Sequence, residues 1–396
     1  MPASPQHLAL TLALLSTSCL SPVAFAKAAL LSTASTDSLT LNGNDTLTLT
    51  PSGSLTTTKV AVTLKDDTRG SGVVIDNAGS LISTGGRAID TSGSTRGERN
   101  YSIINRSGAT IQGSNDALRI DTNFTSGSVL IDNSGTVRST GSGQAIDLDS
   151  LRSEGVQTTL INREGGLIRG EFSDGMKTGS NATILNYGEI SSGDALTDDN
   201  KFDGIDIDSA TGVTVTNHGT LSGGRHGMTT DLGATLVNYG EVTGRNGSGF
   251  GSDGNGTVIN YGTITGAYSG LKPNGDGDGV DIDLIAHIEN YGVIQGTGAG
   301  GVDKNGFANG YRRLEWKCNN DNARSKRTAV RLGYTYEGVF RQHMVVKGKN
   351  RDTTWYSIIS TEWPAVAVGF EKWLALDNQP ESGQIKTLEE CRGKAV

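Results

Sequence analysis

A turn of the form Asn-x-Gly recurs through most of the chain, and this repeat restricts the possible folds more than any other feature. Seven turns have one central residue and two have an additional one. They begin at Asn77, Asn105, Asn133, Asn162, Asn186, Asn217, Asn238, Asn260 and Asn290. The spacing between them runs from 21 to 31 residues. Repeats of this length are typical of solenoids, in which each repeat is one supersecondary unit that packs on the next.

Each repeat carries the signals of short strands. A β-branched run such as residues 257–259 precedes the turn, where Asn and Gly tolerate a positive φ. A second short strand follows the turn. Many repeats add a third strand of the type Ile205-Asp206, in which alternation places Ile inward and Asp in water.

Three short strands per repeat predict a mainly β fold, a right-handed parallel β-helix. Nine rungs would form a rod on the order of 40 Å long. The repeat also predicts two stacks of side chains. The turn asparagines are expected to form an amide ladder. The tyrosines that follow several of them, Tyr187, Tyr239, Tyr261 and Tyr291, are expected to stack beside it.

The composition changes abruptly near residues 304–310. Of the 56 glycines, 49 precede residue 310, whereas all four tryptophans follow it. Residues 1–309 carry 19 Lys and Arg against 32 Asp and Glu (net −13), and residues 310–396 carry 15 against 10 (net +5). A single domain rarely changes in this way. We therefore expect a signal peptide at 1–26, a β-helix domain at 27–304 and a separate fragment at 305–396.

The N-terminus resembles a secretory signal. Residues 8–15 form an apolar core, and Ala24-Phe25-Ala26 offers a small-x-small cleavage site, although a buried N-terminal helix is the alternative. No later apolar run is long enough to span a membrane as a helix, so no transmembrane segment is expected in the mature chain. Residues 27–317 contain no cysteine, and we expect Cys318 and Cys391 to be reduced thiols rather than a disulfide.

The Asn-Tyr-Gly-x-Ile-x-Gly pattern after a signal peptide resembles the passenger repeats of bacterial autotransporters. The resemblance covers residues 27–304. It implies an exported protein, in the periplasm, at the cell surface or secreted, with a structural or adhesive role and with contacts to host surfaces or the cell envelope. No nucleic-acid partner is expected. An exported polysaccharide-cleaving enzyme is an alternative, because many β-helices are lyases or hydrolases.

Acidic residues gather in one part of the repeat. Asp198, Asp199, Asp203, Asp206 and Asp208 could together collect a cation, or could simply be outward positions of strands. His218 and His226 have no neighbouring cysteine or spaced histidine. We therefore expect no metal site.

The segment after Gly310 has different patterns. Residues 311–317 alternate as a strand, and 322–332 fit a helix with Asn320 or Asp321 as N-cap and Gly333 as terminator. Residues 334–346 and 353–359 indicate an antiparallel strand pair joined by the basic loop 347–352. Residues 362–374 fit a last amphipathic helix. This order predicts a small α/β unit.

These residues resemble the C-terminal half of the GNAT superfamily of N-acetyltransferases. The resemblance covers residues 310–375. It rests on GYRRLEWKC, on Asn322-x-x-Ser325, on Arg331-Leu-Gly-Tyr-x-x-Glu-Gly338, and on FRQHMVVKGKNRDTTWYSI followed by EWP. It implies that Asn322 and Ser325 lie near the pantetheine and phosphate arm of acetyl-CoA. An ordinary helix cap is the alternative role for these two residues.

Half of the family's cofactor site has no counterpart in this sequence. The glycine loop that holds the pyrophosphate should precede Gly310 by several dozen residues, but that stretch is repeat sequence ending at Gly300-Gly-Val-Asp303. Without the loop, the diphosphate has no nest of backbone amides. We therefore expect no catalytic residues, no cofactor and no enzymatic activity. Acetyl transfer from acetyl-CoA to an amine is the alternative function.

Overall fold

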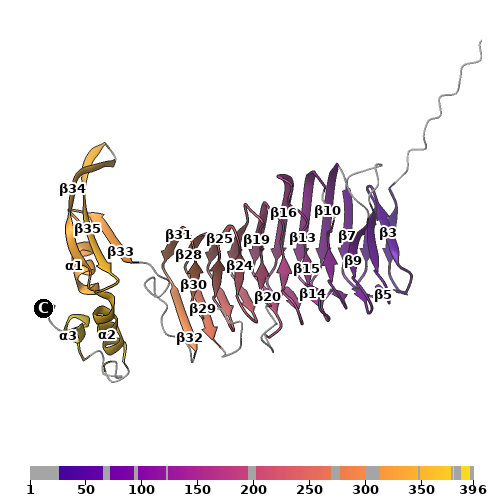
Figure 1. The fold of residues 1–396 in the computed structure, drawn as a ribbon. Coiled ribbons are helices and arrows are strands. Elements are labelled where there is room, and N and C mark those ends of the chain that lie inside the picture. Colours follow the sequence, from indigo (N-terminus) through magenta and orange to yellow (C-terminus); the bar gives the residue numbers. More distant parts are fainter. Residues whose placement is uncertain are drawn as a thin grey trace, which may run out of the picture. The chain divides into compact units, whose positions relative to one another are not determined.

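The computed structural model describes residues 26–65, 72–92, 97–121, 124–194, 202–268, 277–298, 312–346, 348–375, 378 and 385–392. The expected signal segment, apart from Ala26, lies outside the described residues. The chain divides into two compact units, Met1–Gly300 and Gly301–Val396. The first is a stack of parallel strands and the second contains the helices (Figure 1).

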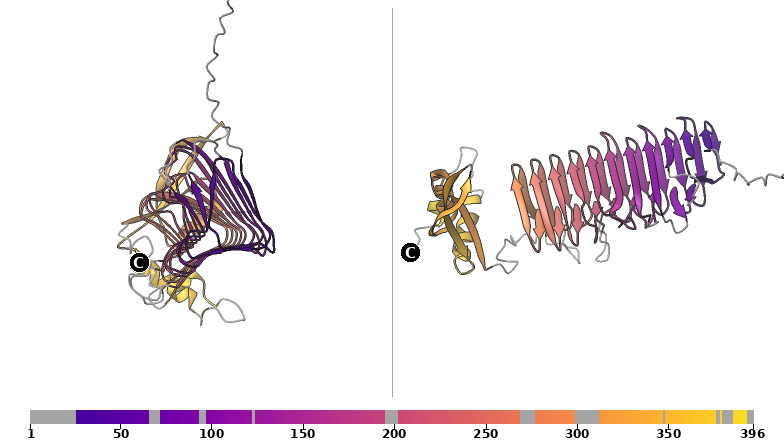
Figure 2. Two further views of the ribbon diagram at one scale, coloured as in Figure 1. Left: turned by 90° about the vertical axis from the view of Figure 1, so that its right-hand side faces the viewer. Right: turned by 90° about the horizontal axis from the view of Figure 1, so that it is seen from above.

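The first unit is built from three parallel sheets that wind around one core. Seen nearly end-on, successive rungs lie behind one another around a three-sided cross-section (Figure 2). Over the described residues, the first sheet contains β1 (Ala28–Leu31), β4 (Thr46–Leu49), β7 (Gly72–Asn77), β10 (Glu98–Asn105), β13 (Ser126–Asn133), β16 (Gly155–Asn162), β19 (Ala182–Asn186), β22 (Thr214–Asn217), β25 (Gly233–Asn238), β28 (Asn255–Asn260) and β31 (Ala286–Asn290).

The second and third sheets repeat this order. The second contains β2 (Ala34–Ser35), β5 (Ser54–Thr57), β8 (Ser80–Ser83), β11 (Thr110–Gly113), β14 (Thr136–Ser139), β17 (Leu167–Gly170), β20 (Glu189–Ser192), β23 (Thr220–Gly223), β26 (Glu241–Gly244), β29 (Thr263–Tyr268) and β32 (Val293–Gly298). The third contains β3 (Leu39–Asn42), β6 (Val62–Lys65), β9 (Ile89–Ser92), β12 (Leu118–Arg119), β15 (Ile146–Asp147), β18 (Met176–Lys177), β21 (Ile205–Asp206), β24 (Met228–Thr230), β27 (Phe250–Ser252) and β30 (Val280–Ile282). The mainly β solenoid expected from the repeat is confirmed.

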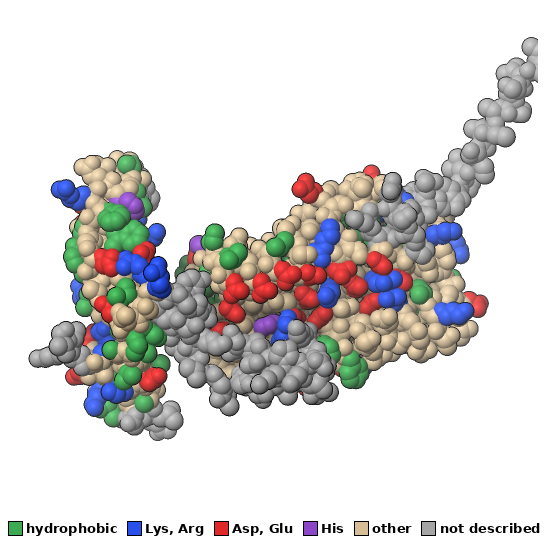
Figure 3. All heavy atoms as spheres, viewed as in Figure 1, with side chains coloured by type: hydrophobic (Ala, Val, Ile, Leu, Met, Phe, Trp, Pro, Cys, Tyr) green, Lys and Arg blue, Asp and Glu red, His purple; other side chains and the backbone are tan. Residues whose placement is uncertain are grey.

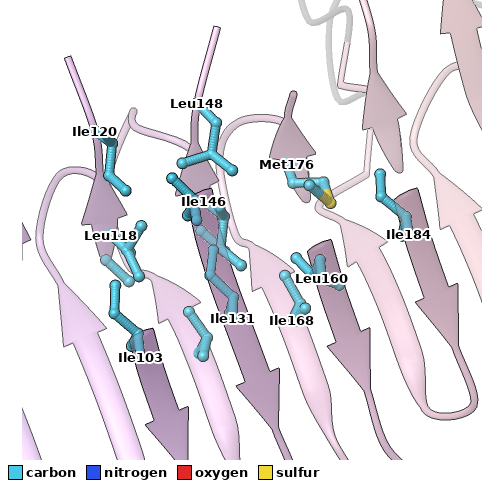
Figure 4. Packing of buried hydrophobic residues seen from close by; sticks show 14 of the residues in the cluster. Ile103, Leu118, Ile120, Ile131, Ile146, Leu148, Leu160, Ile168, Met176 and Ile184 are labelled. Carbon is cyan, nitrogen blue, oxygen red and sulfur yellow. The ribbon is translucent and has the colours of Figure 1, made fainter. Parts of the chain in front are cut away.

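The core is a set of apolar columns, because equivalent residues of successive rungs pair in register. In the first sheet one column runs through Ile103, Ile131, Leu160 and Ile184. In the third sheet another runs through Leu118, Ile146, Met176 and Ile205, and all these side chains are buried. Figure 4 shows several of them packed between the sheets. Each rung therefore stacks its apolar residues on those of its neighbours.

The turn asparagines form the expected ladder. Each donates from Nδ2 to Oδ1 of the next, from Asn77 through Asn105, Asn133, Asn162, Asn186, Asn217, Asn238 and Asn260 to Asn290, at 2.8–2.9 Å. All except Asn290 are at most 1% exposed. The ladder satisfies buried amide groups that would otherwise be costly to desolvate.

Two rungs precede the first asparagine and carry no Asn-x-Gly turn. β1 and β4 pair in register with β7, and the position of Asn77 is taken by Leu49 and Leu31. The nine repeats counted from the sequence are therefore too few, because aliphatic residues replace the amide at the start of the solenoid.

The second unit has a three-stranded antiparallel sheet with the order β33 (Arg313–Asn319), β35 (Lys349–Ile359), β34 (Thr335–Val346). Its helices are α1 (Ala323–Leu332), α2 (Trp363–Leu374) and α3 (Leu388–Arg392). The antiparallel strand pair and the first two helices are confirmed as elements, whereas α3 was not predicted. The basic loop predicted at 347–352 is shorter, because β35 already begins at Lys349 and pairs with the end of β34. Cys318 and Cys391 are both buried free thiols.

Candidate functional site

The third sheet carries a row of alternating charges along the solenoid. Strand pairing places Asp90, Arg119, Asp147, Lys177 and Asp206 at equivalent positions of successive rungs. Arg119 Nε lies 3.0 Å from Asp90 Oδ1, and Lys177 Nζ lies 2.9 Å from Asp206 Oδ2. Figure 3 shows acidic side chains running along this unit with basic ones among them. We call these five residues the charged row.

Asp90 was expected to point into water and does not. It is 8% exposed, because Arg119 and Arg87 both reach its carboxylate. A residue on an outward strand position becomes buried when long side chains of its own rung and the next one lie over it.

A second row of polar residues lies at the corner where each rung enters the third sheet. Asp116, Asp174 and Asp203 are 2%, 6% and 1% exposed. Arg225 binds both oxygens of Asp203, at 3.1 and 2.7 Å, and the amide of Asp203 donates to Asp174 Oδ1 at 2.8 Å. These buried carboxylates therefore have partners on neighbouring rungs, as buried charges require.

Two carboxyl groups of this face have strongly raised pKa values. Burial, then the charges of Asp203 and Asp206, raises the pKa of Asp174 to about 7. Burial, then the charges of Asp149 and Asp116, raises the pKa of Asp147 to about 6. Desolvation and neighbouring negative charge both disfavour the ionised form. This part of the solenoid is therefore where protonation changes near neutral pH.

The described members of the acidic cluster at residues 198–208, for which cation binding and outward strand positions were both considered, mostly lie beside basic side chains. Asp198 and Asp199 lie outside the described residues. Asp203 is paired with Arg225, and Asp206 with Lys177. Within the described parts of the chain, no group of three or more His, Cys, Asp and Glu side chains could hold a metal ion.

The corner row also brings Asp203, His226 and Ser248 together on successive rungs. The geometry is not that of a hydrolase triad. His226 Nδ1 accepts from the backbone amide of Ser248 at 2.8 Å, and the backbone amide of His226 donates to Asp203 at 2.9 Å. Because backbone atoms make both contacts, His226 Nδ1 is not free to activate the Ser248 hydroxyl.

Asn322 and Ser325 lie together at the N-terminus of α1, and both are engaged within the chain. Asn322 is the N-cap, so the assignment of the cap to Asn320 or Asp321 was wrong. Its Oδ1 accepts from the amide of Ser325 at 3.1 Å. The Ser325 hydroxyl accepts from Trp316 Nε1 at 3.0 Å. The geometry is that of an ordinary helix cap, and the cofactor role of these residues stays a prediction.

The sequence reasoning missed Asp147 and Asp174 as special residues. Asp147 is a residue of a third strand, like Asp90 and Asp206, whereas Asp174 lies at the corner before one, like Asp116 and Asp203. The only available signal was therefore their position in the rung. Asp147 and Asp174 differ from the aspartates at equivalent positions in which side chains of the adjacent rungs lie beside the carboxylate.

A groove of about 490 Å³ crosses several rungs of the solenoid on a different face. Its lining includes a row of equivalent residues of the first sheet, Thr214, Thr235, Thr257 and His287. This lining carries hydroxyl groups and little charge. The groove does not include the carboxylates of raised pKa.

Comparison with protein-family models gives no match, and no curated protein matches this chain. Among solved structures, one similar chain is a GCN5-related N-acetyltransferase from Brucella melitensis, with 55% identity over 21% of this chain and 38% of that chain, at a TM-score of 0.21. Another is a probable acetyltransferase of the GNAT family from Chromobacterium violaceum ATCC 12472, with 50% identity over 15% of this chain and 29% of that chain, at a TM-score of 0.15. The chain thus spans well under half the length of either protein.

The helices offer no candidate membrane span. Among the residues that the structure describes, none of the helices is both long enough and apolar enough to cross a bilayer.

Proposed function

We propose that the protein is exported, in the periplasm, at the cell surface or secreted, and that it has a structural or adhesive role without enzymatic activity. The main observation in support is that the rungs of the solenoid bind one another through the apolar columns, the asparagine ladder and the charged row. Residues used in this way build a stiff rod that presents long, regular faces. Host surfaces or the cell envelope are the proposed partners of those faces.

Export is tested by expressing the full chain in a Gram-negative bacterium. The molecular mass of the product is then measured by mass spectrometry in the cytoplasmic, periplasmic, outer-membrane and secreted fractions. We expect a product that begins at Lys27 outside the cytoplasm. Leu12→Arg, which places a charge in the apolar core of residues 8–15, should retain the chain in the cytoplasm, whereas Leu12→Ile should not. An intact chain that begins at Met1 and stays cytoplasmic would contradict export.

The adhesive role is tested by binding of beads coated with the purified chain to host-cell and cell-envelope surfaces. Binding should depend on the folded solenoid, so a heat-unfolded sample is the control. If folded and unfolded samples bind equally, or neither binds more than an unrelated acidic protein, the adhesive role is wrong and a purely structural one remains.

We further propose that the second unit does not catalyse acetyl transfer. Proximity contributes roughly 7–11 kcal/mol to such reactions and requires a thioester held in place. The Asn322 side chain already accepts from the backbone amide of Ser325, and the Ser325 hydroxyl accepts from Trp316 Nε1. A cofactor would have to displace these contacts without a pyrophosphate loop to hold it.

The acetyltransferase alternative is tested by calorimetric titration of acetyl-CoA into the full chain and by thiol release with basic peptides. We expect neither binding nor turnover. Asn322→Ser keeps a helix cap and Asn322→Ala removes it. Micromolar binding that is lost in Asn322→Ala would establish the alternative and overturn our proposal.

The second alternative, cleavage of polysaccharides, is favoured by one observation. Asp147 and Asp174 have pKa values of about 6 and 7 on the same face, and raised carboxyl pKa values are typical of general acids. Release of reducing sugar from acidic and neutral polysaccharides tests it. Activity lost in both Asp147→Asn and Asp174→Asn would support this alternative over a structural role.

A further inference from the structure

An exposed row of stacked aromatic rings follows the asparagine ladder at the corner between the first and second sheets. Tyr187, His218, Tyr239, Tyr261 and Tyr291 each come directly after a ladder asparagine. Consecutive ring centroids lie 4.6–4.9 Å apart, and the ring planes differ by 3–10°. The expected tyrosine stack is thereby confirmed, with His218 as one of its members.

The three rings at the end of the row are consecutive tyrosines. Tyr239 and Tyr261 stack at 4.9 Å, as do Tyr261 and Tyr291, whereas His218 separates Tyr187 from the others. Because the rungs are related nearly by translation, equivalent carbons of neighbouring rings lie about one rung, roughly 4.8 Å, apart. The carbons ortho to each hydroxyl are therefore brought side by side.

The surroundings of these phenols suit oxidation. Tyr239, Tyr261 and Tyr291 are 48%, 47% and 65% exposed, so an oxidant can reach them. Tyr291 Oη donates to Glu289 Oε2 at 3.1 Å. A phenol loses its proton as it loses an electron, and this carboxylate is placed to accept that proton.

We propose that Tyr239, Tyr261 and Tyr291 form a site of oxidative dityrosine cross-linking, which joins neighbouring rungs of one molecule. The oxidant is hydrogen peroxide consumed by a peroxidase. Each of two phenols gives up one electron and one proton, so that the peroxide becomes two water molecules and two tyrosyl radicals remain. A bond then forms between their ortho carbons, and the hydrogens on those carbons move to the oxygens. The protein loses two hydrogen atoms in total.

This inference goes beyond the proposed function and does not depend on it, since it rests only on the geometry of the stack. A covalent bond between rungs would strengthen a rod in a direction otherwise held by hydrogen bonds and packing. The aromatic rings are exposed, whereas the asparagine ladder beside them is buried. Modification of the rings should therefore disturb the ladder little.

The experiment treats the dilute full-length chain with hydrogen peroxide and a peroxidase. Dityrosine fluorescence, migration on a denaturing gel and the masses of proteolytic peptides are then measured. We expect dityrosine in the monomer band, a loss of two hydrogens, and a cross-linked peptide that joins Tyr261 to Tyr239 or Tyr291. Peptide mapping is needed because Tyr336 and Tyr356 of the second unit also contact each other, with centroids 5.6 Å apart.

Single substitutions separate the stack from general tyrosine oxidation. Tyr261→Phe removes both adjacent pairs, so the cross-link within the solenoid should be lost. Tyr187→Phe is the matched control, because its stacking partner is His218, and it should leave the yield unchanged. The double variant Tyr261→Phe with His218→Tyr creates a new run at 187, 218 and 239, and the cross-link should return at these positions.

Circular dichroism of each variant checks that the solenoid is folded. Cross-links found only between molecules, or only in the Tyr336–Tyr356 pair, would overturn the proposal. Equal losses in Tyr261→Phe and Tyr187→Phe, or a folded double variant without rescue, would overturn it as well.

Discussion

At the scale of single residues, the ladder asparagines are the side chains on which the solenoid depends most. Asn217 donates to Asn238 Oδ1 at 2.9 Å, to the carbonyl of Glu241 at 3.0 Å and to that of Gly219 at 3.1 Å, and it is fully buried. Asn217→Ala leaves buried partners unsatisfied, at about 1–3 kcal/mol for each such group. We expect a large loss of unfolding free energy in urea titrations. Asn290→Ala, at the exposed end of the ladder, should cost much less, and equal losses would contradict this account.

The raised carboxyl pKa values belong to the same scale and predict a pH dependence. Folding raises the pKa of Asp174 from 3.8 to about 7 and that of Asp147 to about 6, so the folded state favours their protonated forms. Their contribution is fully present below pH 3.8 and is lost as the pH rises through 6 and 7. Stability should therefore fall between about pH 6.5 and pH 8, by at most about 1.4 kcal/mol per unit for one group.

The prediction is restricted to pH values above about 6.5 because a second group titrates below that range. Burial lowers the pKa of His226, so protonation of this histidine at lower pH destabilises the folded state. Asp174→Asn keeps an acceptor for the amide of Asp203 and removes the titration. Thermal melts of this variant should show a flatter pH dependence than the original chain. If the stability of Asp174→Asn depends on pH between about 6.5 and 8 as steeply as that of the original chain, Asp174 does not titrate in this range.

At the scale of elements, the register between strands depends on a close backbone approach. Gly127 in β13 has a φ of 122°, and a Cβ there would lie 1.9 Å from the carbonyl oxygen of Arg99 in β10. Gly127→Ala should therefore disrupt the β10–β13 pair. Gly165→Ala is the matched control, because Gly165 has a φ of 76° with no atom within 4 Å of the added Cβ, and it should cost only about 1–2 kcal/mol of backbone strain. Urea unfolding of the two variants checks the difference, and similar losses would contradict it.

At the scale of the whole molecule, the chain should unfold in two steps, because each unit has its own core. All four tryptophans follow residue 310, so tryptophan fluorescence reports only the second unit. Far-ultraviolet circular dichroism is dominated by the strands of the solenoid. We expect the fluorescence transition at a lower urea concentration than the dichroism transition. Coincident transitions would mean that the units unfold as one.

Features that depend on local chemistry were predictable from the sequence. The Asn-x-Gly repeat and period-two alternation identified the solenoid because both are properties of a few neighbouring residues. The positive φ expected in the turns occurs only in the two longer ones, at Gly108 and Gly165. In the short turns glycine is needed for a close backbone approach instead, since a Cβ at Gly188 would lie 2.2 Å from the carbonyl oxygen of Gly166. The change in glycine, tryptophan and charge near residues 304–310 predicts a division of the chain, and the two compact units are Met1–Gly300 and Gly301–Val396. The strands and the first helix of the second unit followed from alternation and from Gly333 as the helix terminator, although the N-cap was assigned to the wrong residue.

Features that depend on contacts between distant residues were not predictable from the sequence. Leu31 and Leu49 extend the ladder position without its motif, because packing against the core, rather than an amide, holds them there: Leu49 is buried and Leu31 half-buried. The choice of Asn322 over Asn320 as cap depended on Asn320 being drawn to Thr354 and Lys326. Asp174 and Asp203 occupy equivalent positions of their rungs, each followed by a glycine, yet Asp174 is enclosed by Asp203 and Asp206 while Asp203 binds Arg225. A pKa is set by side chains close in space, and in a solenoid these come from the next rung, some 20 to 30 residues away along the chain.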